Sequence, residues 1–295
     1  MNPRERGFLL LTSHLGDPNR RVLSASQLRT LAERVRTMEP GGQDRDLEEK
    51  DLLALGFGRE TAGRILALLG QEAELEYYLR RGAKKGCVPV TRVSPDYPGL
   101  LRRRLGQESP GCLWCRGETA LLNTPAIALV GSRELREENR VFAAEVGRQA
   151  ALQGLTLVSG NARGADRTAQ KACLEAGGRV ISIVADELSR QPLRENVLYV
   201  SEEDFDLPFS AQRALSRNRC IHALGRMVFV AQSDWGRGGT WDGTVKNLRA
   251  GWSPVACFRD GGEAMTRLET LGAYLVDLPD LQALEAFAQP EIRLF

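Results

Sequence analysis

The chain contains 295 residues, of which 42% are hydrophobic, so it can bury one sizeable core and a smaller second one. It has no apolar run long enough to cross a bilayer and no signal-type cleavage site near Met1, which favours a cytoplasmic protein without a membrane partner. The formal net charge of +2 is nearly balanced, so a nucleic-acid site requires arginines gathered locally, not a global positive field.

Residues 1–82 carry apolar side chains at helical spacing and are predicted to form a small all-α accessory domain of helix-hairpin-helix or SAM-like type. Helices are predicted over Leu28–Val35, Leu47–Leu55 and Thr61–Leu69. Between the last two, residues 55–58 read Leu-Gly-Phe-Gly, a pattern in which glycines let backbone amides approach a phosphate. A plain tight turn between packed helices is the favoured interpretation, because Gly-x-Gly turns are common.

Residues 83–290 are predicted to form a larger α/β domain. Gly82–Gly117 contains four prolines, which is typical of an extended connector with one or two short strands and a helical turn near Leu100–Leu105. Beyond it, short β-rich runs alternate with helical stretches, and the predicted strands are Ala126–Val130, Leu155–Val158, Val180–Val184, Met227–Val230 and Pro254–Phe258. This alternation predicts a Rossmann-like, doubly wound parallel sheet with helices on both faces.

The helices between these strands each carry a face suited to packing on a sheet. Phe142, Val146 and Ala150 share one face of the first helix. An alanine face is predicted on the next helix, formed by Ala165, Ala169, Ala172 and Ala176. A final helix is predicted over Leu281–Phe287.

Four loops next to predicted strands carry arginines, and three of them also carry glycines. They are Gly131-Ser132-Arg133, Ser159-Gly160-Asn161-Ala162-Arg163-Gly164-Ala165-Asp166, Ser216-Arg217-Asn218-Arg219 and Gly236-Arg237-Gly238-Gly239-Thr240. Glycines and a helix N-terminus form an anion site, arginine can grip a phosphate, and Asp166 can cap a helix or orient an arginine. Each motif alone is weak, but loops at the carboxyl edge of a parallel sheet meet in one crevice, so the four together predict one phosphate-binding site.

The order and spacing of these motifs carry a resemblance to a known family. The matching elements are Tyr97-Pro98, Leu101, Leu105, Pro110, Arg116-Gly117, the first three loops above and Gly177-Gly178. Over about residues 85–260 the chain therefore resembles the DNA-processing protein A family. The resemblance implies an extended Rossmann fold, a homodimer, and non-catalytic binding of single-stranded DNA that is delivered to a RecA-type recombinase in natural transformation.

The resemblance assigns the phosphate grip to Arg133 and Arg163 and matches Arg217-Asn218-Arg219 to the family's Arg-Asn-Arg element. The predicted nucleic-acid-binding set is Gly131, Ser132, Arg133, Ser159, Gly160, Asn161, Arg163, Gly164, Asp166, Arg217, Asn218, Arg219, Gly238, Gly239 and Thr240. The chain departs from the family pattern at three places: Asn161 replaces a glycine, Ala214-Leu215 replaces a Phe-Pro pair, and residues 236–244 replace a Ser-Gly-Ser element. Asparagine tolerates the left-handed conformation, so the turn at residue 161 is expected to persist.

A second hypothesis is a sensor of a nucleotide-derived ligand, or a phosphoribohydrolase, on the same fold. Related hydrolases carry Gly-Thr-x-x-Glu, whereas this chain has Gly243-Thr244-Val245-Lys246-Asn247, with asparagine where the glutamate would act. Without that carboxylate no group is left to activate water, so we expect no catalytic residue. No cofactor is expected either, because neither a Gly-x-Gly-x-x-Gly pattern after the first strand nor a P-loop occurs.

Two smaller features allow alternative interpretations. Cys112-Leu113-Trp114-Cys115 has metal-type spacing but lacks a second pair, so packing is favoured and no metal is expected; the six cysteines are expected to be reduced thiols. Trp235 and Trp241, beside the basic loops, suit either stacking on DNA bases or covering the core.

Overall fold

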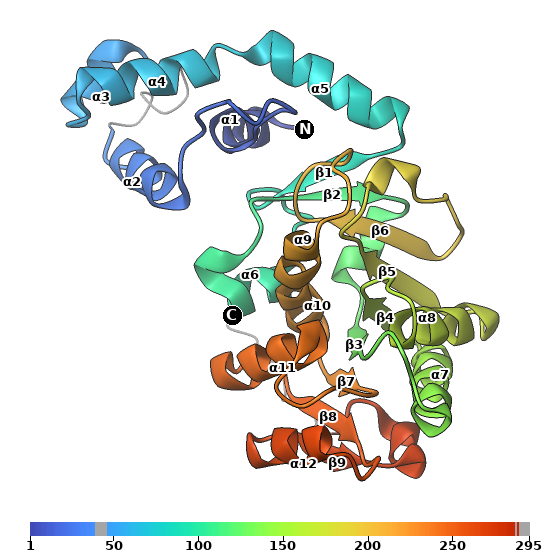
Figure 1. Cartoon of the computed structure of the whole chain (residues 1–295). Helices are drawn as coiled ribbons and strands as arrows, with labels where there is room; N and C mark the ends of the chain where they lie inside the picture. The colour runs from blue at the N-terminus through green and yellow to red at the C-terminus, as the bar shows by residue number, and fades with distance from the viewer. Residues whose placement is uncertain (39–45, 287, 289–295) are drawn as a thin grey trace. The chain divides into compact units, whose positions relative to one another are not determined.

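The computed structural model describes residues 1–38, 46–286 and 288. The chain divides into two compact units (Figure 1). The first, called here the helical unit, comprises residues 1–85 and 93–95. The second, called here the α/β unit, comprises residues 86–92 and those from 96 onward.

The described part of the helical unit is all-α, as predicted, and contains five helices, of which α1 and α5 were not among the three predicted ones. They are α1 (Pro3–Thr12), α2 (Ala25–Val35), α3 (Glu49–Ala54), α4 (Arg59–Leu69) and α5 (Glu72–Lys84). Capping boxes begin the first two: Asn2 with Glu5, and Ser24 with Gln27. The turn between α3 and α4 contains Gly56 at φ +81°. Phosphate binding at this turn stays a prediction.

A nine-stranded sheet forms the centre of the α/β unit. In sheet order its strands are β1 (Val88–Thr91), β2 (Cys112–Arg116), β6 (Val197–Ser201), β5 (Arg179–Ile183), β4 (Thr156–Ser159), β3 (Ala126–Val130), β7 (Val228–Val230), β8 (Val255–Phe258) and β9 (Tyr274–Val276). The strands from β6 to β9 are parallel, whereas β1 and β2 extend the sheet with antiparallel pairs. The predicted Rossmann-like fold class is confirmed, and β6 and β9 are strands that the sequence pattern did not predict.

The chain reverses direction in the middle of this sheet. From β3 it steps outward through β4, β5 and β6, and then crosses back to place β7 on the other side of β3. Ligands of open α/β sheets bind at such a reversal, outside the carboxyl ends of the strands. The fold therefore puts the loops after β3, β4 and β7 side by side at the expected binding position.

Helices cover both faces of the sheet, with α7 and α8 on one face and α10 and α11 on the other (Figure 1). The α-helices of this unit are α6 (Gly99–Leu105), α7 (Glu137–Leu152), α8 (Ala165–Glu175), α9 (Ala211–Ser216), α10 (Asn218–Leu224), α11 (Gly238–Ala250) and α12 (Glu263–Thr270). Short 3-10 turns occupy Gly106–Glu108, Thr119–Asn123 and Leu188–Arg190. The predicted face of α7 is confirmed, since Phe142, Val146 and Ala150 are fully buried.

Two helix predictions need correction. On α8 the buried apolar residues are Ala165, Ala169 and Cys173, whereas Ala172 is only half-buried. Ala176 is exposed, because the helix ends at Glu175. Near the C-terminus a 3-10 helix spans Leu278–Ala283 instead of the predicted 281–287, started by a capping box between residues 277 and 280. Residue 287 lies outside the described residues. Within the described part of the chain, no helix combines the length and the apolar character that a bilayer span requires.

Candidate nucleic-acid interface

The first and second motif loops contact each other at the carboxyl edge of the sheet. The backbone amide of Ser132 donates to the carbonyl of Gln232, after β7, at 2.9 Å. The amide of Ala165, the first residue of α8, donates to the carbonyl of Ser132 at 3.2 Å. These two bonds join the ends of β3, β4 and β7, as the predicted convergence of the loops requires.

The second loop takes a backbone course that needs special residues. Asn161 lies in the left-handed region at φ +63°, so the expected persistence of the turn is confirmed. Gly164 has φ +86°, and a Cβ atom there would lie 2.4 Å from the carbonyl oxygens of Ser132 and Arg133. Asp166 caps the loop by accepting from the amide of Ala162 at 3.0 Å. Glycine at residue 164 therefore lets the loop after β3 lie directly against the start of α8.

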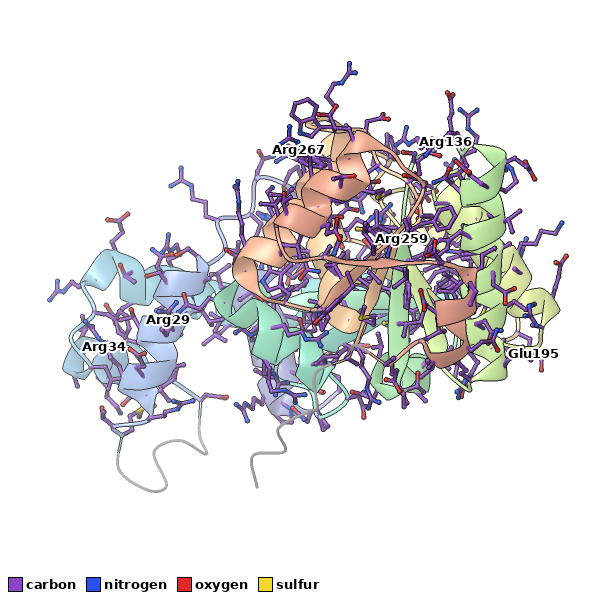
Figure 2. The ribbon with its side chains drawn as sticks, turned by 90° about the horizontal axis from the view of Figure 1, so that it is seen from below. Arg29, Arg34, Arg136, Glu195, Arg259 and Arg267 are labelled. Carbon is purple, nitrogen blue, oxygen red and sulfur yellow. The ribbon has the colours of Figure 1, made fainter. Side chains whose placement is uncertain are left out.

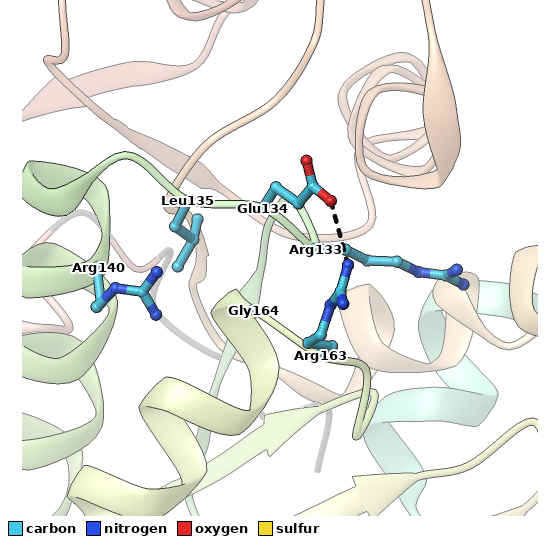
Figure 3. Close-up of a pocket in the computed structure, with 6 residues that line it drawn as sticks. All are labelled: Arg133, Glu134, Leu135, Arg140, Arg163 and Gly164. Atoms are coloured by element: carbon cyan, nitrogen blue, oxygen red, sulfur yellow. Dashed lines mark hydrogen bonds and ion pairs between the residues drawn. The ribbon is translucent and has the colours of Figure 1, made fainter.

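A cavity of about 350 Å³ lies where these loops meet (Figure 3). Its lining residues are Arg133, Glu134, Leu135, Arg140, Arg163 and Gly164. Arg163 forms an ion pair with Glu134 at 3.1 Å, and both side chains are largely exposed, at 73% and 88%. Exposed pairs of this kind contribute at most about 1 kcal/mol, so a phosphate can replace the Glu134 carboxylate on Arg163.

Arg217 is buried in the protein and is not among the residues that line the cavity. The residue is 7% exposed, and its guanidinium donates to the carbonyl of Gly160 at 3.0 Å and to Asn218 Oδ1 at 2.9 Å. It lies 4.0 Å from the carboxylate of Asp166. Burial raises the pKa of Asp166 and lowers the pKa of Arg217, and each charge partly offsets the effect on the other. Arg217 therefore holds the second loop from inside.

Arg219 and Asn218 are likewise engaged within the protein. Arg219 pairs with the buried carboxylate of Glu202 at 2.8 Å and donates to the carbonyls of Ser216 and Glu108. Asn218 donates to the carbonyl of Gly239 at 3.0 Å and so ties α10 to the start of α11.

The fourth motif forms the first turn of α11. Gly238, Gly239 and Thr240 are its first three residues, and Arg237 precedes them without a side-chain cap. The first amides of a helix have no partner within it and favour anions. The motif therefore presents amide donors at the same edge of the sheet as Arg163.

The structure thus divides the predicted set into an exposed and an internal part. Arg133 and Arg163 are exposed, whereas Arg217 is buried and Arg219 is half-buried, so the four arginines are not equally open to one crevice as expected. Ser159 is also fully buried, and its hydroxyl accepts from Gln170 at 2.6 Å. Nucleic-acid binding by Arg217, Arg219 and Ser159 stays a prediction. Sequence reasoning missed Arg140 because this arginine lies within α7, outside the four motifs.

The residues of the second hypothesis lie in the interior. Thr244 and Asn247 are fully buried, and the Asn247 carboxamide oxygen accepts from the amide of Ser253 at 2.8 Å. His222 is also fully buried, and burial lowers its pKa to about 3. Asn247 therefore acts in packing at the position of the expected glutamate.

The structure also shows the surroundings of the two cysteines and two tryptophans that allowed alternative interpretations. Cys112 and Cys115 lie on β2, and burial raises the pKa of both thiols. Among the described residues, no three His, Cys, Asp or Glu side chains are grouped closely enough to hold a metal ion. Trp241 packs against the core, whereas Trp235 is 51% exposed.

Comparison with known proteins gives consistent matches over the α/β unit. The family model for DNA recombination-mediator protein A matches residues 89–247. Protein Smf of Escherichia coli strain K12 is 30% identical over 135 residues, which are 42% of this chain and 36% of that protein. The DNA processing protein DprA of Streptococcus pneumoniae strain R6 is 33% identical over 145 residues, 43% of this chain and 48% of that protein. The chain therefore spans between about a third and a half of these relatives.

Two solved structures share the fold. DNA processing protein A from Streptococcus pneumoniae aligns with 88% of this chain and 98% of its own, with a TM-score of 0.65 and 22% identity. The protein of the same name from Helicobacter pylori, studied for its single-stranded DNA binding mode, aligns with 69% of this chain and 97% of its own. Its TM-score is 0.56 at 22% identity.

Proposed function

Because the chain belongs to the DNA recombination-mediator protein A family, we propose that it binds single-stranded DNA at the carboxyl edge of its sheet without making or breaking a bond. One observation carries this proposal: the loops after β3 and β4 meet beside the N-terminus of α8 and expose Arg133 and Arg163 there. Guanidinium groups exposed at the carboxyl edge of a parallel sheet are suited to the phosphates of a strand.

In this mechanism the exposed arginines bind successive phosphates. Arg163 exchanges its pair with Glu134 for a phosphate, while Arg133 and Arg140 neutralise neighbouring charges. The amides at the start of α11 supply further donors. Arg217 and Arg219 contribute by holding the loops that present these groups.

The partners of this binding follow from the family resemblance. We propose delivery of the bound strand to a RecA-type recombinase in DNA uptake and recombination, by a homodimer acting in the cytoplasm. The relatives extend beyond the matched region, so these partners are proposals for the whole protein.

A nucleotide-derived ligand is the second candidate for the same site. The cavity of about 350 Å³ lies within the size range of small-molecule pockets, and its cationic lining suits a phosphate group. A catalytic version of this candidate is disfavoured by the burial of Asn247.

The test is a fluorescence-anisotropy titration of a labelled oligo-dT strand at several salt concentrations, with duplex DNA and nucleoside monophosphates as competitors. Tight, salt-dependent binding that prefers the single strand is expected. Arg163→Glu is expected to abolish binding while the fold persists, because the side chain is exposed. Arg249→Glu, the same charge change in the last turn of α11, serves as the control. Unchanged affinity in Arg163→Glu contradicts the site, and competition by a nucleotide without strand binding favours the second candidate.

A further inference from the structure

Trp235 is the exposed aromatic residue of the loop that follows β7. It lies at the tip of a tight turn closed by a bridge between Asp234 and Arg237, with Gly236 in the left-handed region at φ +68°. The residue is 51% exposed, although burial of an indole in the core would stabilise the fold. The turn therefore keeps a large apolar ring partly exposed to solvent.

Arg267 fixes the orientation of this ring. Its guanidinium lies over the indole, 5.2 Å from the ring centroid, and it pairs with Glu263 at 3.6 Å on the same helix, α12. Figure 2 shows Arg267 on this helix. A cation over one face restrains the ring and leaves the exposed part of the indole for another flat partner.

The loop of Trp235 is joined to the phosphate-binding loops by hydrogen bonds. Gln232, three residues earlier, donates to the carbonyl of Glu134 at 3.1 Å and accepts from the amide of Arg136 at 2.9 Å. Three residues span at most about 11 Å, so the backbone of Trp235 lies within about that distance of the Gln232 backbone, whose side chain bonds the loop after β3. The exposed Arg237 follows two residues later.

We propose that Trp235, held by Arg267, is a stacking platform for one unpaired base of the strand. This inference rests on the proposed function and adds to it a subsite that binds the base instead of the phosphate. Stacking on an aromatic side chain beside a positively charged path is the chemistry that recognises single strands without reading their sequence. The cation over the ring and the hydrogen bonds that join its loop to the loop after β3 favour a nucleic-acid base over an apolar protein surface.

The experiment compares Trp235→Ala with the wild type by anisotropy, using oligo-dT and an oligonucleotide of equal length that carries abasic positions. Trp235→Ala is expected to weaken oligo-dT binding roughly five- to 150-fold, the range for loss of one stacked base. The slope of affinity against salt is expected to stay unchanged, because no charge is lost. Affinity for the abasic strand is expected to change much less.

Two further measurements make the result specific. Tyr274 is 46% exposed at the start of β9, on the amino edge of the sheet and not on the carboxyl edge. Tyr274→Ala removes this aromatic ring and is expected to bind like the wild type. Quenching of tryptophan fluorescence by the strand is expected to be lost in Trp235→Phe, since the other three tryptophans are more buried.

The outcomes separate the two proposals. If the wild type binds the strand and Trp235→Ala binds oligo-dT equally well, the platform is wrong and the phosphate site stands. Equal losses on the abasic strand also overturn the platform, because they assign Trp235 a role without a base. If the wild type does not bind the strand, the proposed function itself fails.

Discussion

At the scale of single residues, Arg163 and Arg217 show how arginines of neighbouring motifs take different roles. The side chain of Arg163 is 73% exposed and that of Arg217 is 9% exposed, although both belong to loops at the same edge of the sheet. An exposed guanidinium is available to a phosphate, whereas a buried one beside Asp166 balances a charge that water cannot reach.

Arg217→Met is therefore expected to lower the free energy of unfolding by about 3–5 kcal/mol, because it leaves the Asp166 carboxyl buried without its cation. Urea-induced unfolding followed by circular dichroism measures the change. Arg163→Met is the matched control, with a stability change within about 0.5 kcal/mol but a salt slope for strand binding lowered by about 0.7. An Arg217→Met variant that keeps wild-type stability and loses one counterion from its salt slope would assign this arginine to direct strand contact.

The sequence could not separate these two arginines, because neither local pattern shows which side chain becomes buried. Arg163 lies in the loop after β4, and Arg217 lies between α9 and α10. The burial of Arg217 is decided by the crossover that lays α10 under the loop after β4. Asn161, by contrast, was predictable, since its left-handed backbone depends on the residue itself.

At the scale of elements, strand prediction succeeded for the five β-rich runs that alternate with predicted helices. The five predicted strands agree with β3, β4, β5, β7 and β8 within one residue at each end. The pattern missed β6, whose run Val197–Ser201 follows a charged stretch, and β9, which has only three residues and an exposed tyrosine. A short edge strand such as β9 forms only through pairing with its neighbour β8, and no pattern in the strand itself reveals that pairing.

The buried histidine of α10 makes the free energy of unfolding depend on pH. His222 of α10 is fully buried, and burial together with the charge of Arg217 lowers its pKa from 6.5 to about 3. Between these values the unfolded chain binds a proton that the folded protein excludes, so stability falls as the pH drops below 6.5. His222 is expected to contribute about 2 kcal/mol to the loss of folding stability between pH 8 and pH 5.

Urea unfolding of His222→Gln across this pH range measures that contribution, because the variant is expected to lose less stability on acidification than the wild type. His14→Gln, which changes the exposed histidine of the helical unit, is expected to keep the full acid loss. Parallel pH profiles of His222→Gln and the wild type would show that the His222 ring accepts a proton in the folded state.

At the scale of the whole molecule, the two units have separate hydrophobic cores. The core of the helical unit draws its buried residues from positions 11–68, and the main core of the α/β unit draws its own from positions 90–273. The residues predicted for strand binding all belong to the α/β unit. The two units are therefore expected to unfold in separate transitions, and strand binding is expected to depend on the second alone.

Leu52→Ala tests this division, because Leu52 is fully buried in the core of the helical unit. Removal of its side chain costs about 2–5 kcal/mol and is expected to shift only one of two calorimetric transitions, with the affinity for oligo-dT unchanged below that transition. Leu198→Ala, fully buried on β6, is the matched variant for the other transition and is expected to reduce strand binding as that transition approaches. A single transition displaced as a whole by either variant would show that the units unfold together, and lost affinity in Leu52→Ala would then place the helical unit within the strand-binding function.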